Sequence, residues 1–246
     1  MKKFAPTSLD ARPAKSKSAG PKPAGHKSAG SKAAELRAAG LAGAHLRRHV
    51  QTPAASARAL EDATARLASR RQRDVLPGRI ETRRLVLRAP IRGDVPDIVG
   101  LADNRRIHEV LSRLPNPYTR ADATAFVEIF AQRADERPFA ITLDGRFIGV
   151  VGFTYQQGEP PELGYWLGEP YWGKGYMSEA VKALLDTAFA THQYPLIRSR
   201  ALATNTASLN VLEKAGFKRL REGTDESGTL KGKPVVFLLL EQPRWM

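Results

Sequence analysis

The chain has 246 residues, enough for one domain of average size and an appended segment. It contains no cysteine, which excludes disulfides, thiolate zinc sites and a cysteine nucleophile. The net charge of +14 is uneven, because residues 1–79 hold 17 Lys and Arg against 5 Asp and Glu. The basic character therefore belongs to the front of the chain and says little about the fold behind it.

No apolar run approaches the ~20 residues that span a bilayer. The N-terminus also lacks the apolar stretch of a secretory signal. We therefore expect a cytoplasmic protein without membrane contact.

The first 79 residues form a basic, low-complexity extension. Residues 5–32 are almost entirely Ala, Pro, Lys, Ser and Gly, a composition that cannot bury enough apolar surface to fold. Helical spacing of Leu60, Ala63 and Leu67 predicts a marginal helix, which Pro77-Gly78 ends like a linker. Basic disorder favours phosphates, so contact with nucleic acid or ribosomes, a solubilising tail and an overlong start all stay open. We favour a non-catalytic tail.

The domain that follows comprises residues 80–246. Strand and helix signals alternate along its first half. Thr119–Asp122 resembles a capping box, and Asp144-Gly145 is a hairpin signal between two apolar runs. The patterns predict a strand at 84–88, a helix at 94–102, a helix from Thr119 to about 134, and strands at 139–143 and 147–153.

The second half continues with a strand at 162–167, a Gly-rich loop and a helix whose apolar residues between Met177 and Phe189 follow helical spacing. The patterns then predict a strand at 197–203, a helix at 205–215, and strands near 217–221 and 234–240. This order predicts an α/β (α+β) layer fold with a mainly antiparallel sheet, in which the long helix can join two parallel neighbours.

The Gly-rich loop at 168–175 nearly matches a Walker A loop. Gly175, however, stands where a Ser or Thr must hold magnesium, and Pro170 removes an amide donor. The dinucleotide fingerprint also fails, because Ser178 replaces its third glycine. The feature that these motifs share with the loop is a strand, a turn and a helix N-terminus, which place free backbone amides around an anion. A plain strand-to-helix turn is the alternative.

Four segments, in this order along the chain, make the expected function of the loop more specific. Together they resemble the GNAT acetyltransferase superfamily, and most closely its RimJ/RimL-like branch. They are Glu162–Leu167, Trp172–Ala180, Asn205–Ser208 and Glu213–Phe217. The resemblance covers roughly residues 80–240 and implies a GNAT-type central sheet flanked by helices. Residues 1–79 take no part in it.

The resemblance also implies a site for acetyl-CoA as co-substrate. The loop would bind the pyrophosphate through the backbone amides of Trp172, Gly173, Lys174, Gly175, Tyr176 and Met177. The strand ending at Trp166 and Leu167 would diverge from the strand at 197–203 and admit the pantetheine arm, and Asn205 would contact that arm. Two positions depart from the family pattern: Trp172 replaces the usual Arg or Gln, and Leu212 replaces a Tyr that protonates the leaving thiolate.

The chemistry requires a neutral amine and a proton for the departing thiolate. Glu162 is the candidate base, with an exposed strand-edge carboxylate as the alternative. Ser208 is the candidate donor to the thiolate, with a plain helix-start residue as the alternative. No histidine has a metal-ligand partner, so no metal is expected, and His108 is expected at the surface.

The sequence thus predicts an N-acetyltransferase that moves an acetyl group from acetyl-CoA to a primary amine by direct attack in a ternary complex. The acceptor is a protein N-terminus or a small amine, and the protein acts as a monomer or homodimer. The alternative is a catalytically weak CoA-binding module, or a nucleic-acid-associated one that uses the basic tail.

Overall fold

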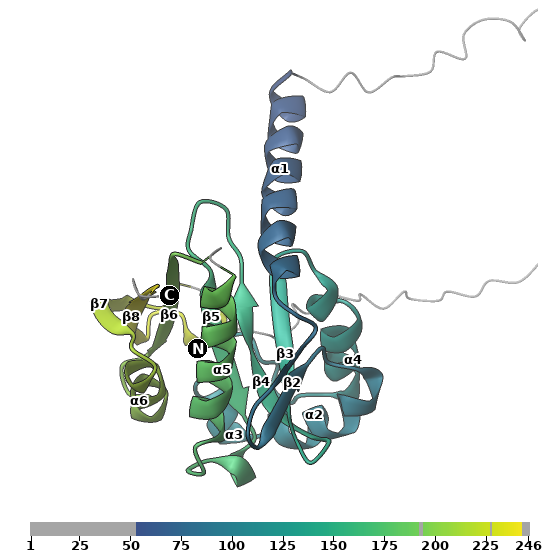
Figure 1. Ribbon diagram of the computed structural model, residues 1–246, viewed down its shortest axis with the longest axis vertical. Helices are drawn as coiled ribbons and strands as arrows, with labels where there is room; N and C mark the ends of the chain where they lie inside the picture. The colour runs from purple at the N-terminus through teal and green to yellow at the C-terminus, as the bar shows by residue number, and fades with distance from the viewer. Residues whose placement is uncertain (1–52, 192–193, 227, 243–246) are drawn as a thin grey trace, which may run out of the picture. The chain divides into compact units, whose positions relative to one another are not determined.

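The computed structural model describes residues 53–191, 194–226 and 228–242 (Figure 1). The predictions for residues 1–52 lie outside these ranges. The chain divides into two units, and the second, Leu9–Leu60, contributes to the description only the first residues of helix α1 (Pro53–Val75). The fold described here is that of the unit from Glu61 onward.

A single sheet organises the described residues of this unit. Its strand order is β1-β2-β3-β4-β5-β6-β8-β7, and every neighbouring pair is antiparallel except β5 and β6. The predicted mixed, mainly antiparallel fold is confirmed. The strands are β1 (Arg79–Glu81), β2 (Leu85–Arg88), β3 (Glu136–Leu143), β4 (Arg146–Thr154), β5 (Glu162–Leu167), β6 (Leu196–Leu202), β7 (Lys218–Thr224) and β8 (Pro234–Glu241).

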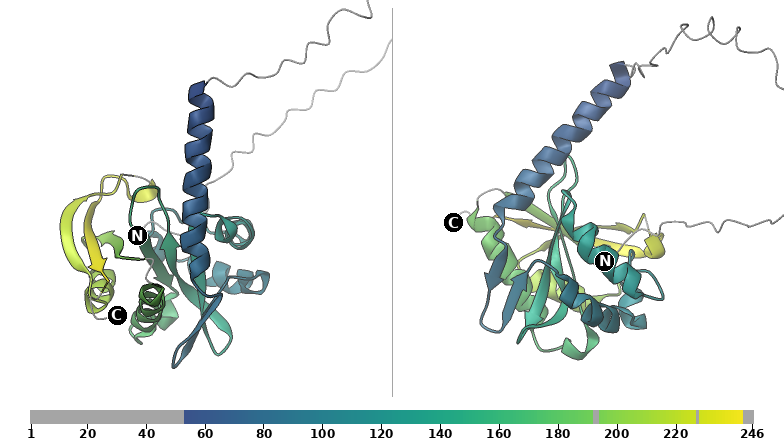
Figure 2. Two further views of the ribbon diagram at one scale, coloured as in Figure 1. Left: turned by 45° about the horizontal axis from the view of Figure 1, so that its top comes forward. Right: turned by 90° about the vertical axis from the view of Figure 1, so that its right-hand side faces the viewer.

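Helices cover both faces of the sheet, as the two views of Figure 2 show. One face packs against α5 (Tyr176–Ala190) and α6 (Thr206–Lys214) through a core that includes Val181 and Leu184. The other face packs against α2, α3 and α4 through residues such as Ile98 and Phe126. These three helices are α2 (Val95–Ala102), α3 (Arg105–His108) and α4 (Arg120–Glu128).

Local signals in the sequence explain several element boundaries. Thr119 accepts a hydrogen bond from the Asp122 amide, and the Asp122 side chain accepts one from the Thr119 amide, so the predicted capping box is confirmed. Asp144 and Gly145 both have positive φ, as a two-residue hairpin requires. The helix expected to reach about residue 134 ends at Glu128 and is followed by a 3₁₀ turn, η2 (Phe130–Gln132).

The expected linker at Pro77-Gly78 is held against the sheet. Leu76 is buried, and the Arg137 guanidinium donates to the carbonyls of Leu76 and Pro77. The Tyr194 hydroxyl donates to the carbonyl of Gln72. The end of α1 therefore packs with the folded unit. Within the described ranges, no helix is long and apolar enough to cross a membrane.

The parallel strands β5 and β6 pair only briefly. Their backbone register joins Glu162 to Arg198, and the Ser199 hydroxyl then donates to the Leu163 carbonyl at 2.9 Å. A side chain thus supplies the bond where the backbones begin to separate. The two strands diverge toward Leu167 and Leu202, and this divergence opens the sheet between its two halves.

Candidate active site

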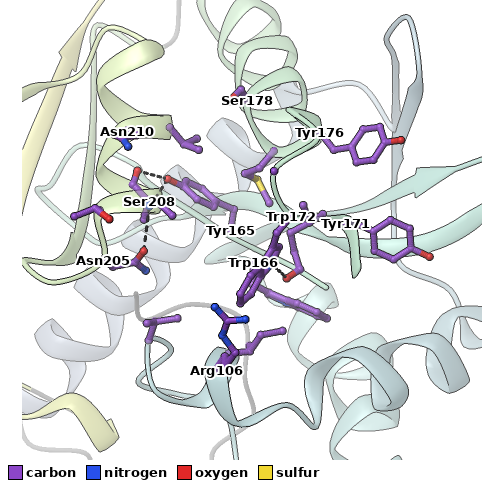
Figure 3. A pocket seen from close by; sticks show the side chains of 18 of the residues that line it. Arg106, Tyr165, Trp166, Tyr171, Trp172, Tyr176, Ser178, Asn205, Ser208 and Asn210 are labelled. Atoms are coloured by element: carbon purple, nitrogen blue, oxygen red, sulfur yellow. Dashed lines mark hydrogen bonds between the residues drawn. The ribbon is translucent and has the colours of Figure 1, made fainter. Parts of the chain in front are cut away.

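A pocket of about 610 Å³ lies where β5 and β6 diverge (Figure 3). The strand end, the Gly-rich loop, the first turns of two helices and the α3 region converge on it. It is lined by residues 165–167, residues 171–178 apart from Lys174, residues 204–208, Asn210, Val211, Lys214, and residues 106–111 apart from His108.

The Gly-rich loop forms one wall of the pocket and requires its glycines. Gly173 and Gly175 have φ of 74° and 78°, a left-handed conformation that side chains disfavour. α5 begins directly after them, and the amides of Tyr176, Met177 and Ser178 have no partner within the helix because its first turn lacks preceding carbonyls. These amides and the positive end of the helix dipole suit an anion.

Arg84, which directly precedes β2, holds this loop in place. Its Nε donates to the Glu179 carboxylate at 2.7 Å, and its Nη1 donates to the Lys174 carbonyl at 3.0 Å. Thr82 also donates to Glu179, so the turn before β2 holds the start of α5. These bonds oppose the desolvation of Glu179 and lower the pKa of its carboxyl. The Arg84 guanidinium further stacks over the Tyr176 ring.

Trp172 links the loop to α3. Its indole Nε1 donates to the Leu167 carbonyl at 2.7 Å, and the Arg106 guanidinium lies 5.1 Å from its ring centroid. Arg106 and the Asn104 amide both bind the Glu169 carboxylate, and these bonds, Asn104 first, lower the pKa of Glu169. The α3 wall and the loop wall of the pocket are thereby joined.

Ser208 and Asn205 lie at the start of α6, as predicted. The Asn205 side chain accepts from the Ser208 amide at 3.1 Å and caps the helix. The Tyr165 hydroxyl, from β5, lies 3.0 Å from both the Ser208 hydroxyl and the Ser208 carbonyl (Figure 3). Burial raises the pKa of Tyr165 although the bond to Ser208 opposes the shift, so its phenol stays protonated at neutral pH.

Glu162 lies apart from this group. It is only 6% exposed and does not line the pocket, so the alternative of an exposed edge carboxylate is wrong. Its carboxylate oxygens lie 3.5 Å from Arg198 Nε and 3.3 Å from Arg200 Nε. Two guanidiniums from β6 therefore balance its buried charge.

The structure brings together most of the residues predicted for cofactor binding. Lys174 is the exception among them, since its ammonium turns to the Pro170 carbonyl and it does not line the pocket. The pocket is lined by Trp166, Leu167, Trp172, Gly173, Gly175, Tyr176, Met177, Asn205 and also Ser208. Sequence reasoning missed Arg84 and Arg106, which act on the loop from distant parts of the chain.

The family model of the acetyltransferase (GNAT) domain matches residues 84–218. The chain belongs to this family. The matched segment contains the loop, the diverging strands and the capped start of α6.

Curated relatives agree with the family. The chain is 36% identical to "Uncharacterized N-acetyltransferase p20" of Bacillus licheniformis over 29% of this chain and 42% of that relative. It is 33% identical to "Probable N-acetyltransferase YjcK" of Bacillus subtilis (strain 168), over 51% of this chain and 76% of the relative. The chain thus spans less than half of the first relative.

The fold is also that of RimL, a ribosomal L7/L12 alpha-N-protein acetyltransferase solved in complex with coenzyme A. The TM-score is 0.59 at 21% identity, with 66% of this chain and 97% of that chain covered. At this identity the likeness shows the fold alone.

Proposed function

We propose that this GNAT acetyltransferase uses acetyl-CoA to acetylate a primary amine by direct attack in a ternary complex. The observation that carries the proposal is the continuous pocket that joins the Gly-rich loop to the divergence of β5 and β6. A diphosphate fits the free amides at the start of α5, and an extended arm fits between the strands, where backbone groups are available. The RimL structure holds coenzyme A on the same fold.

The residues that line the pocket have separate roles. Residues 172–177 bind the pyrophosphate through backbone amides, and Gly173 and Gly175 let that backbone come close to it. Asn205 holds the first turn of α6 beside the arm of the cofactor. Ser208, hydrogen-bonded to the buried phenol of Tyr165, donates to the sulfur as the thiolate leaves.

The acceptor is an alkyl amine of a protein N-terminus or of a small molecule. The motifs at 172–180 and 205–208 resemble those of the RimJ/RimL-like branch, which supports this choice. The role of Glu162 as the base stays a prediction. Its carboxylate is bound by Arg198 and Arg200 and lies outside the pocket.

The test combines binding and turnover. Calorimetry with coenzyme A should show binding at a 1:1 ratio, and release of free thiol from acetyl-CoA should depend on an added amine. An acceptor panel of peptides with free N-termini, amino acids and aminoglycosides then identifies the class. Binding without thiol release from any acceptor would reduce the protein to a CoA-binding module, and absence of binding would refute the proposal.

We also propose that residues 80–246 form the transferase domain and that residues 1–79 are a non-catalytic extension. The pocket lies wholly between residues 106 and 214, which supports this division. Removing residues 1–52 should leave thiol release unchanged. A binding titration with RNA across salt concentrations, run with and without these residues, tests the extension as a nucleic-acid tether.

A further inference from the structure

The α3 side of the pocket contains a carboxylate that the predicted mechanism does not use. Among the described residues that line the pocket, Glu109 alone carries a carboxyl group. The other charged side chains there are the cations Arg106 and Lys214. An alkyl ammonium that enters the pocket therefore meets one group of opposite charge.

The fold holds this position firmly. Glu109 is the C-cap of α3, and its amide donates to the Arg105 carbonyl at 2.9 Å. Ile107 before it is 2% exposed, and Val110 after it packs against the apolar cluster that contains Leu202, at the end of β6. The backbone at residue 109 is therefore anchored on both sides, next to the opening between β5 and β6.

The side chain itself is free to exchange partners. Its carboxylate pairs with Arg105 Nε at 2.9 Å, and the two side chains are 56% and 90% exposed. Such an exposed pair, four residues apart on a helix, contributes only about 0.3–0.5 kcal/mol. An incoming ammonium can replace Arg105 at little cost. Glu162 differs, because separating it from two arginines would leave buried charges without compensation.

We propose that Glu109 binds the ammonium of the acceptor and accepts its proton. The inference rests on the proposed acetyl transfer and deepens it. Glu109 takes one proton from the ammonium, directly or through one water, and returns it to solvent. The neutral nitrogen forms a bond to the thioester carbon and the carbon–sulfur bond breaks. The Ser208 hydroxyl gives its proton to the thiolate and regains one as the second proton of the nitrogen leaves. Acetamide, coenzyme A thiol and one released proton balance the step.

The titratable groups around Glu109 determine which ionisation a pH experiment measures. Besides Glu109, the titratable groups that line the pocket are Arg106, Lys214 and the phenols of Tyr165, Tyr171 and Tyr176. Arg105 and His108 flank Glu109 on α3, and Glu169 of η3 (Glu169–Tyr171) pairs with Arg106. The titration that matters is that of the acceptor. A peptide α-amine has a pKa of about 8, so it is mostly protonated at pH 7 and mostly neutral at pH 9.5.

The decisive variant is Glu109→Gln, which keeps the shape and removes the charge. We expect kcat with a peptide amine at pH 7 to fall by about 100-fold or more, as is typical for loss of a general base. Coenzyme A affinity and the melting temperature should stay unchanged. The deficit should shrink at pH 9.5, where the amine needs no base. Glu109→Asp should restore part of the rate, and Arg105→Ala, which keeps the carboxylate, should retain it.

Other outcomes separate the two proposals. Wild-type protein that releases no thiol with any amine refutes the proposed function itself. An active wild type with Glu109→Gln within threefold of its rate at both pH values overturns the role of Glu109. The same holds if the deficit is equal at both pH values, which marks a structural effect. If Glu162→Gln instead folds and shows the pH-dependent loss, the base is Glu162.

Discussion

Replacing Gly175 by Ala tests the anion-binding loop most directly. Gly175 precedes α5 with φ 78° and ψ 2°. A Cβ added there would lie 3.5 Å from Arg84 Nη2, an ordinary contact, so crowding is not the difficulty. The cost is that of holding an L-residue in the left-handed region, about 1–2 kcal/mol.

This free energy is lost either from the stability of the fold or from the affinity for coenzyme A. If the substituted loop relaxes in the free protein, the amides turn away from the anion, and binding must restore the strained conformation. The Kd for coenzyme A then rises by about 5- to 30-fold, the equivalent of 1–2 kcal/mol. If the loop does not relax, the same energy is lost from the free energy of unfolding.

Calorimetry with coenzyme A and urea unfolding measure both quantities on the same variant. The matched control is Gly145→Ala in the β3–β4 turn, because Gly145 has φ 80° and open space around its Cβ. The control should lose stability without losing affinity. The reasoning fails if Gly175→Ala changes neither quantity, or if Gly145→Ala weakens binding as strongly.

Three further substitutions probe other parts of the fold. Arg84→Ala removes the contacts to Glu179 and the Lys174 carbonyl, and because the pair is partly exposed we expect about a fivefold rise in the coenzyme A Kd by calorimetry, near 1 kcal/mol. Ser208→Ala should lower kcat in the thiol-release assay on the order of 100-fold while affinity stays within twofold; an unchanged kcat would remove Ser208 as donor. Burial raises the pKa of Glu136 from 4.5 to about 7, so the folded state binds more protons between these values and stability falls as pH rises through this window. Urea unfolding should show a loss of about 3 kcal/mol that is absent in Glu136→Gln.

Local patterns in the sequence were sufficient for the longer elements. The period of α5 and the turn at Asp144-Gly145 each specify their structure within a few residues. The strand β1 and the helix α3 were missed, because three and four residues are too few to show a period. β3 begins at Glu136 rather than 139, since its first residues pair with β4 alone.

The parts of the site that could be predicted are those whose residues are close together in the sequence. The glycine loop and the capped start of α6 are each contiguous in the sequence, and the structure brings them to one pocket. Arg84 and Arg106 reach the loop from far away in the chain, so only the assembled sheet reveals them. The same limit explains His108, which was expected at the surface but whose side chain is 8% exposed.

The buried Tyr165 phenol contacts α6, the helix on which the family resemblance leads one to expect a tyrosine. Leu212 stands where the family resemblance leads one to expect a tyrosine, and its side chain is fully buried. The resemblance implies that a tyrosine there would protonate the thiolate. Here Tyr165 arrives from β5 instead and bonds to Ser208 in the first turn of the same helix. Burial keeps this phenol protonated, and its one proton is donated to the Ser208 carbonyl, so the phenol oxygen can accept the Ser208 hydroxyl proton until that hydroxyl turns to another acceptor. In the proposed mechanism, the Ser208 hydroxyl held beside this phenol is the proton donor that Leu212 cannot be.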